Sequence, residues 1–281
     1  MRVAVFLSSK KRESRIVTNF AKGVVRAGDQ VEIVQPAGRP TSDPDAALIF
    51  GIKSDKYWHE MKAAGVRVVY GDKGYSRIDS GWRYLRFCWD DTQPLDYLER
   101  ARHAPDRWLS LKTPLAPFRG RGKHVIFAGS SAKFHVWHGI EHPTAYAEKV
   151  TRRITELVDR PVVYRVKPSW TDKEPVRVPG VGYSPGKTPI ERELRGAHCL
   201  VTFGSNAGVD ALIAGVPAIA LGPAVFRSVA GTDLEEVAKP RIPTDEERLQ
   251  FFANLAHCQW TEEEIKSGDA WRALREREHA G

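Results

Sequence analysis

The feature that most constrains the fold is an alternation of short apolar runs with helical segments, and it begins at the first residues of the chain. In the first half, apolar and β-branched runs bounded by Gly, Pro and Asp occupy residues 2–7, 30–34, 46–51 and 66–71. Segments with apolar residues at helical spacing occupy residues 16–28 and 54–65. Strands that alternate with helices predict a parallel, doubly wound α/β sheet.

The second half of the chain shows the same alternation without repeating the sequence. Its apolar runs occupy residues 124–129, 161–168, 198–204 and 217–222. The spacing predicts helices over 142–158, near 188–196 and over 206–214. We therefore predict two doubly wound, Rossmann-like domains that face each other across a cleft.

A stretch rich in proline, glycine and basic residues, 113–123, separates the two halves and has the composition of a linker. The tail from residue 244 onward is typical of amphipathic helices with acidic first turns, which suit the helix dipole. These signals predict an N-terminal domain over 1–115, a C-terminal domain over 116–260, and a C-terminal helix over 261–281 that packs back on the N-terminal domain.

Composition limits the possible partners and the location of the protein. The formal net charge of +8 favours acidic partners such as nucleic acid or phosphorylated ligands, although a basic surface that binds neither fits equally well. No apolar run approaches the roughly 20 residues of a membrane helix, and the apolar part of the N-terminus is too short for a secretory signal. We therefore expect a soluble, cytoplasmic protein.

The cysteines do not predict a metal site. Cys88, Cys199 and Cys258 are far apart in the sequence and lack CxxC or Cys/His metal spacing. They are expected to be ordinary buried thiols rather than ligands or disulfide partners. Neither a GxGxxG segment nor a P-loop is present, which argues against a dinucleotide oxidoreductase and a P-loop enzyme.

The stretch FGSNAGVDALIAGVPAIALG, residues 203–222, places small polar residues between a strand and a short helix. Ligands of open α/β sheets bind beyond the carboxyl ends of the strands, where helix N-termini present unpaired N–H groups. Gly204 allows close backbone approach, and Ser205 or Asn206 can donate to a phosphate oxygen. The alternative is that Ser205 only caps the helix.

A second strand end carries similar groups. Ser130 and Ser131 follow the run that starts at residue 124, and Lys133 comes two residues later. His135 and His138 lie near this serine pair, but no GxSxG elbow is present, so a serine hydrolase is not indicated.

A third strand end adds positive charge. Arg165 and Lys167 lie on one face at the end of run 161–168, because strand side chains alternate with period two. Both are expected to reach one anion and to stabilise a departing diphosphate without a metal. The predicted donor residues are Ser130, Ser131, Lys133, Arg165, Lys167, Ser205 and Asn206, with Thr232 or Asp233 for a ribose unless these two only cap a helix.

The acceptor side is predicted in the aromatic stretch that follows residue 70. Asp72 comes at the end of the fourth strand, where a general base can take the proton of an acceptor hydroxyl; Asp90 and Asp91 are rivals. Basic and aromatic residues interleave here, which is typical of a surface that stacks bases and neutralises phosphates, or of one core face of a strand. The predicted acceptor residues are Lys73, Tyr75, Arg83 and Arg86, together with His138.

The two doubly wound halves, the Gly-Ser-Asn turn before DALIAGVPAIALG and the returning C-terminal helices resemble glycosyltransferases of the GT-B fold. The resemblance implies that the C-terminal domain binds a nucleotide-sugar and the N-terminal domain binds the acceptor. The chain departs from the retaining families because it has no clear Glu-x-x-x-x-x-x-Glu segment that reads the base.

Several segments, among them VYGDKGYSR, HVIFAGSSAKFHVWHG and YRVKPSW, also resemble proteins of tailed phages and prophages. That resemblance implies a DNA-modifying transferase whose acceptor is a hydroxymethylated base in bacteriophage DNA. A base in a duplex must leave the stack to reach an active site.

These observations predict a metal-independent glycosyltransferase with a nucleotide-sugar as co-substrate, no cofactor, and DNA as partner. A polysaccharide glycosyltransferase or a nucleotide-sugar epimerase of the same fold is the alternative enzyme. A non-catalytic module that binds nucleic acid is the alternative outside enzymes.

Overall fold

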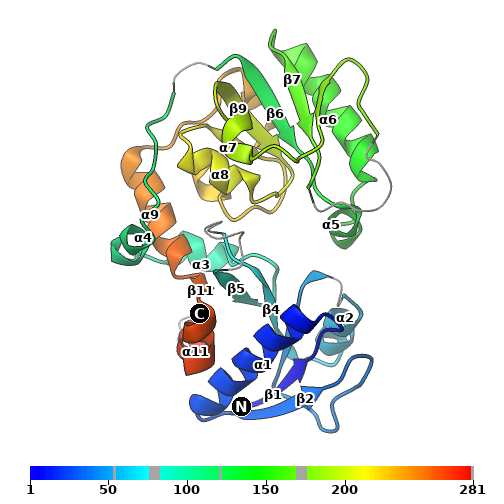
Figure 1. The fold of residues 1–281 in the computed structure, drawn as a ribbon, viewed down its shortest axis with the longest axis vertical. Helices are drawn as coiled ribbons and strands as arrows, with labels where there is room; N and C mark the ends of the chain where they lie inside the picture. Colours follow the sequence, from blue (N-terminus) through cyan, green and yellow to red (C-terminus); the bar gives the residue numbers. More distant parts are fainter. Residues whose placement is uncertain (53–54, 76–82, 120–121, 169–175, 280–281) are drawn as a thin grey trace. The chain divides into compact units, whose positions relative to one another are not determined.

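The computed structural model describes residues 1–281 except 53–54, 76–82, 120–121, 169–175 and 280–281. The chain forms two compact units, shown in Figure 1. Unit 1 comprises Met1–Tyr97 and Leu255–Gly281, and unit 2 comprises Leu98–Asn254. The sequence predicted boundaries at 115/116 and 260/261. Because unit 2 already begins at Leu98, the proline-rich stretch 113–123 lies inside it.

Unit 1 is built on a six-stranded sheet with the strand order β11-β5-β4-β3-β1-β2. The parallel strands are β1 (Arg2–Phe6), β2 (Gln30–Val34), β3 (Ala46–Phe50) and β4 (Arg67–Lys73). The other two strands, β5 (Leu85–Trp89) and β11 (Gln259–Trp260), run antiparallel to their neighbours β4 and β5. The sheet is therefore mixed, where the sequence predicted a parallel one. Only residues 74–84 join β4 to β5, which is shorter than the crossover that a parallel pair needs.

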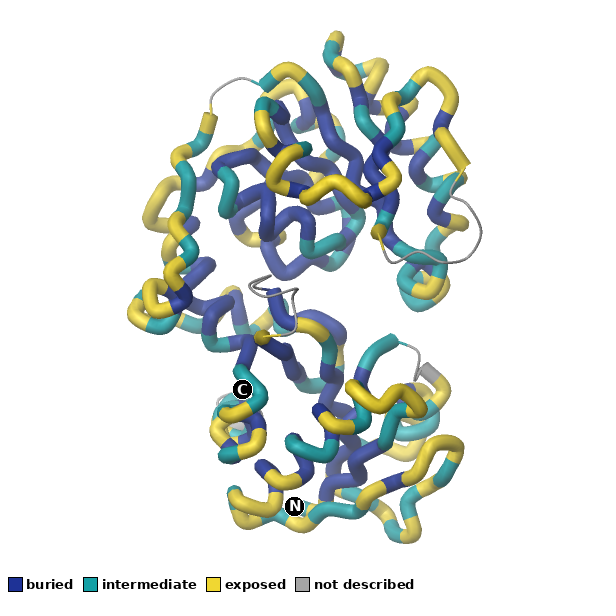
Figure 2. The backbone as a smooth tube through the Cα atoms, viewed as in Figure 1, coloured by how far each residue is buried: buried dark blue, intermediate teal, exposed yellow. Residues whose placement is uncertain are grey.

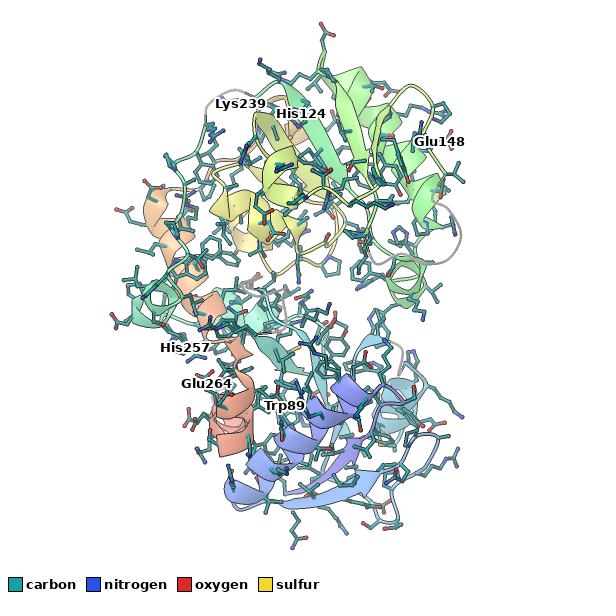
Figure 3. The ribbon with its side chains drawn as sticks, in the orientation of Figure 1. Trp89, His124, Glu148, Lys239, His257 and Glu264 are labelled. Carbon is teal, nitrogen blue, oxygen red and sulfur yellow. The ribbon has the colours of Figure 1, made fainter. Side chains whose placement is uncertain are left out.

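The C-terminal helices pack on the N-terminal helix of the same unit, and Figure 1 shows α11 beside α1. These helices are α1 (Lys11–Arg26), α10 (Glu262–Ser267) and α11 (Asp269–His279), and α2 (Asp55–Ala63) links β3 to β4. A methyl group at Gly23 would lie 2.1 Å from the carbonyl oxygen of Ile265, so only glycine permits this approach of α1 to α10. Trp89, labelled in Figure 3, donates from its indole N–H to the Leu274 carbonyl oxygen at 2.8 Å.

Unit 2 is built on a five-stranded, fully parallel sheet with the order β10-β9-β6-β7-β8. Its strands are β6 (His124–Ala128), β7 (Val162–Arg165), β8 (Gly182–Ser184), β9 (Ala197–Thr202) and β10 (Ala218–Ala220). Its helices are α4 (Asp106–Ser110), α5 (Ala132–Trp137), α6 (Pro143–Leu157), α7 (Ile190–Glu193) and α8 (Ala207–Ile213), with short 3₁₀ turns η3 (Arg227–Val229) and η4 (Leu234–Ala238). Helices α3 (Leu95–Arg100) and α9 (Asp245–Ala256) contain the two points where the chain passes between the units.

Helices cover both faces of the unit 2 sheet. Apolar side chains of α6, among them Ile154, pack with Val125, Phe127 and Val201 on one face. Helices α7 and α8 pack on the other face, which carries Ile126 and Leu200 among others. Figure 2 shows the strands of this unit as mainly buried.

The doubly wound α/β character predicted for both halves is confirmed, and the predicted strands and helices are present. The short elements β5, β8, β11, α5 and η3 were not predicted. Among the described helices, none has both the length and the apolar character that crossing a membrane requires.

Candidate functional site

The order of the strands in unit 2 defines a switch point at the carboxyl edge of its sheet. From the central strand β6 the chain moves to β7 and β8 on one side, and it then returns to β9 and β10 on the other side. The segments that follow β6 and β9 therefore lead to helices on opposite faces of the sheet. In open α/β sheets, ligands bind beyond the strand ends at such a point.

The ends of β6 and β9 are tied together by one buried hydroxyl. Thr202 Oγ1 donates to the Ala128 carbonyl oxygen at 2.8 Å and accepts the backbone N–H of Ser205 at 3.1 Å. A methyl group at Gly204 would lie 2.7 Å from the Pro223 carbonyl oxygen, so the loop requires glycine here. The two predicted phosphate-binding segments are thus held next to each other.

The hydroxyl and amide side chains of these segments differ in their roles. Ser205 Oγ accepts the backbone N–H of Ala207 at 3.3 Å, so Ser205 caps α8, which was the alternative given for it. The Asn206 side chain makes no capping hydrogen bond to α8, and the Ser131 side chain makes none to α5. Ser130 is buried. Ser131 and Asn206 are therefore neither fully buried nor used as helix caps, and the Ser205 hydroxyl keeps its own proton to donate.

Aromatic rings pack beside the switch point. The ring centroids of Phe134 and His138 lie 4.4 Å apart, and those of His138 and Phe203 lie 5.6 Å apart. Tyr146 packs edge-on to Phe203 at 5.8 Å. His138, which we predicted as an acceptor residue, thus belongs to an aromatic cluster of unit 2.

The predicted role of Arg165 is not supported by the structure. Arg165 is buried, and its Nη1 lies 2.6 Å from Glu193 Oε1, which also accepts the hydroxyl of Ser184. The guanidinium already has an internal counter-ion, so it does not join Lys167 on one anion. Lys167 is half-buried beyond the end of β7, and Lys133 is exposed on α5.

The segment that was expected to hold a ribose forms a helix cap instead. The Asp233 side chain accepts the Glu235 backbone N–H at 3.0 Å, and Glu236 Oε1 accepts the backbone N–H groups of Thr232 and Asp233 at 2.7 and 3.0 Å. This reciprocal capping box was the alternative interpretation. The Asp233 carboxylate is therefore occupied in organising η4.

In unit 1, Asp72 lies in β4 directly opposite Arg86 in β5. Its Oδ2 accepts the Tyr70 hydroxyl at 3.1 Å and lies 3.4 Å from Arg86 Nη2, while its Oδ1 accepts the Lys73 backbone N–H at 2.7 Å. The side chain of Asp72 keeps 36% of its surface exposed, so the carboxylate is accessible and oriented. The sequence prediction missed Tyr70, although its i, i+2 spacing from Asp72 on a strand places both on one face.

The predicted base-stacking surface is largely buried. Tyr75 and Arg86 are 1% and 7% exposed, and the Arg86 Cζ lies 5.0 Å from the centroid of the Tyr75 ring. They form one face of the sheet core, which was the alternative interpretation, because β5 is covered on both faces. Lys73 and Arg83 are exposed, whereas the neighbouring Arg77 and Trp82, which contributed to this prediction, lie outside the described residues.

The rival base candidates have structural roles. Asp90 is paired with Lys62 and Arg67 at 2.9 Å each and accepts the Val68 N–H at 2.9 Å. Asp91 accepts the backbone N–H of Thr92, which follows it directly. Asp72 therefore remains the best placed of the three for proton transfer.

The chain superposes on two solved structures of Thermosulfurimonas dismutans KpsC. With the beta Kdo 2,4 transferase the TM-score is 0.52 at 14% identity, covering 91% of this chain and 90% of that chain. With the beta Kdo 2,7 transferase the TM-score is 0.50 at 14% identity, covering 99% and 100%. At this identity the similarity shows the fold, and the chain has the GT-B-like fold that the sequence predicted.

The remaining comparisons add no support for a function. A UDP-GlcNAc 2-epimerase from Methanocaldococcus jannaschii aligns with a TM-score of 0.31 at 9% identity, covering 99% of this chain and 100% of that chain, which is too low for an inference. No protein-family model matches the chain, and no curated protein matches its sequence.

Proposed function

We propose that the protein is a glycosyltransferase that moves a sugar from a nucleotide-sugar to a hydroxyl acceptor. The nucleotide binds at the switch point of unit 2, between the segments 129–131 and 203–206. The observation that carries the proposal is the Thr202 link between two glycine-containing strand ends, beside which Ser131 and Asn206 are not used as caps. The fold shared with two Kdo transferases supports the same class of reaction.

In the proposed reaction, Asp72 takes the proton of the acceptor hydroxyl. The acceptor oxygen forms a bond to the anomeric carbon of the sugar, and the bond between that carbon and the phosphate oxygen breaks. The nucleotide leaves with the electron pair, and the proton remains on Asp72 until solvent removes it. Lys133 and Lys167 supply positive charge for the leaving phosphate, and we propose that no divalent cation is required.

The acceptor proposed from the sequence was a hydroxymethylated base in DNA. Burial of Tyr75 and Arg86 removes two of the residues on which that proposal rested. The net charge of +8 and the exposed Lys73 and Arg83 still favour a polyanion. We therefore keep hydroxymethylated DNA as the acceptor to test first, with a saccharide hydroxyl as the comparison.

The test has two stages. A thermal-shift panel with nucleoside mono- and diphosphates and their sugar forms should show stabilisation by one nucleotide and its sugars. The sugar form that stabilises most is then incubated with hydroxymethylated DNA, plain DNA and oligosaccharides, with and without EDTA. Transfer that is retained in EDTA and lost in Asp72→Asn supports the proposal. Stabilisation by DNA alone, with no effect of any nucleotide, would instead indicate a nucleic-acid-binding module.

A further inference from the structure

One face of the unit 1 sheet carries buried polar groups that converge on the partly exposed Asp72 carboxylate. Directly opposite residues of an antiparallel pair project to the same face, which brings Arg86 to Asp72 across the β4–β5 pair. Tyr70, two residues before Asp72 on β4, reaches the same face. Both donors contact the same oxygen, Oδ2, at 3.1 Å from the tyrosine and 3.4 Å from the arginine.

The position of Arg86 is costly for the folded protein. Among the residues that the structure describes, its buried Nε and Nη1 atoms have no hydrogen-bond partner, and its ion pair is the 3.4 Å contact with Asp72. A folded protein is often less stable with a buried charge and unpartnered donors than with an apolar side chain of similar volume at the same position. The cost of this residue is therefore better explained by an effect on Asp72 than by a contribution to stability.

The groups around Arg86 are themselves fixed. The Tyr75 ring that covers the guanidinium donates its hydroxyl to Gln93 Oε1 at 2.8 Å, and its backbone N–H donates to Gln259 Oε1 at 2.8 Å. Gln259 belongs to β11, so the returning C-terminal segment also takes part in holding this arrangement. A side chain held from several elements has few alternative positions, which is what orientation of a reacting group requires.

We infer that Tyr70 and Arg86 are positioning residues that fix the Asp72 carboxylate through Oδ2 and leave Oδ1 to receive the proton of the acceptor. The inference rests on the proposed function, in which Asp72 is the base. Burial, and then the nearby Asp72 charge, raise the pKa of Tyr70 well above its ordinary value, so its hydroxyl stays protonated and donates throughout the neutral range.

The first test compares Tyr70→Phe and Arg86→Met with the wild type in steady-state transfer and in thermal unfolding. We expect kcat to fall about tenfold to a hundredfold, with the KM for the donor unchanged, because only the orientation of the base is lost. The melting temperature of Arg86→Met should stay the same or rise, because an unpartnered buried charge is removed. Arg86→Lys should recover part of kcat, and Tyr57→Phe in α2 is the matched tyrosine control.

The second test places the same changes in an Asp72→Asn background. Residues that act only through Asp72 should cause no further loss of kcat once the carboxylate is gone. A wild-type kcat in Tyr70→Phe and Arg86→Met would overturn the inference, and so would a full further loss of kcat when these changes are added to Asp72→Asn. Neither result would affect the proposed transferase function. An unchanged kcat in Asp72→Asn would show that Asp72 is not the base, and the inference about Tyr70 and Arg86 would fall with it. Failure of the wild type to transfer from any donor would refute the proposed function itself.

Discussion

The two sheets finish their parallel strands in different ways. In unit 2 the strand ends at the switch point lead into glycines and small polar residues, and a single threonine hydroxyl joins them. In unit 1 the last parallel strand turns back into an antiparallel partner, and the shared face carries an arginine, two tyrosines and an aspartate. In the function proposed above, the same doubly wound architecture carries a phosphate site at one edge and a proton-transfer site at the other, because function depends on the loops and neighbouring side chains.

Both units contain buried arginines with a carboxylate partner, and two of these pairs, Arg165–Glu193 and Arg86–Asp72, differ in geometry and exposure. Arg165 and Glu193 of unit 2 are 8% and 12% exposed in their side chains, with 2.6 Å between the atoms. The Arg86–Asp72 pair of unit 1 is longer, at 3.4 Å, and its carboxylate is 36% exposed. We expect the first pair to matter for folding and the second for catalysis.

The largest expected effect is on the structural pair of unit 2. Glu193→Ala should reduce the free energy of unfolding by about 3–5 kcal/mol, because it leaves the Arg165 charge buried without a partner. Chemical denaturation measures this, and Glu191→Ala, exposed on the same helix, is the control. If Glu193→Ala kept its stability but lost nucleotide affinity, Arg165 would have to act in donor binding, and the contrast between the two pairs would not hold.

The next effect concerns the phosphate edge. Ser131→Ala and Asn206→Ala should each weaken nucleotide binding by about tenfold to a hundredfold, since a hydrogen bond to a charged group contributes about 1.5–3 kcal/mol. Neither change should alter the melting temperature, because neither side chain caps its helix. Calorimetric titration measures the affinity, with Ser228→Ala on η3 as control. Equal affinities in all variants would exclude these side chains from the site.

A smaller effect tests whether the C-terminal helices are an integral part of unit 1. Gly23→Ala should reduce the free energy of unfolding by about 1–3 kcal/mol, because its methyl group would lie 2.1 Å from the Ile265 carbonyl oxygen and force α10 outward. Lys22→Ala, exposed on the same helix, is the control. An unfolding curve of Gly23→Ala that overlays the wild type would mean that α10 is not held against α1.

The smallest effect is a pH dependence at Asp90. Burial raises the pKa of Asp90, but the Val68 N–H, Lys62 and Arg67 lower it more, and the net result lies below the ordinary 3.8. The stability that this carboxylate contributes is therefore present above that ordinary value and is lost as pH falls through the lower, folded-state pKa.

Asp90→Asn should accordingly cost about 1 kcal/mol at pH 7 and progressively less below pH 4. Asparagine tolerates the positive φ of 54° at this position, so the backbone is not strained by the change. Denaturation of both proteins across the pH range gives the difference. A cost that is the same at pH 7 and at low pH would show that the ion pairs are not its source.

The alternation of strands and helices was enough to predict most of the fold, because both units bury apolar runs between helices. The antiparallel strands β5 and β11 were missed, and each omission has a physical reason. Strand β5 (Leu85–Trp89) contains a buried arginine and two aromatic residues, so it resembles a functional surface in sequence. Strand β11 has two residues, and its pairing with β5 depends on a contact across most of the chain.

The candidate site was predictable only in part. The glycine and hydroxyl segments were found because they directly follow strands, and parallel strands bring their ends together. The partners of charged residues could not be found from the sequence. Glu193, for example, reaches Arg165 only once β7, β8 and α7 have packed. Capping by Asp233 and Ser205 was foreseen as an alternative, and the structure shows both capping hydrogen bonds, although the Ser205 hydroxyl keeps its own proton to donate.

The most direct test of the account is hydrogen exchange of the wild-type protein with and without the nucleotide that stabilises it most. The account predicts slower exchange in the segments around 129–137 and 203–213, which flank the switch point of unit 2, and no change in the strands β2 and β3 of unit 1. Protection confined to unit 1, or no protection at either segment of unit 2, would contradict the proposed donor site.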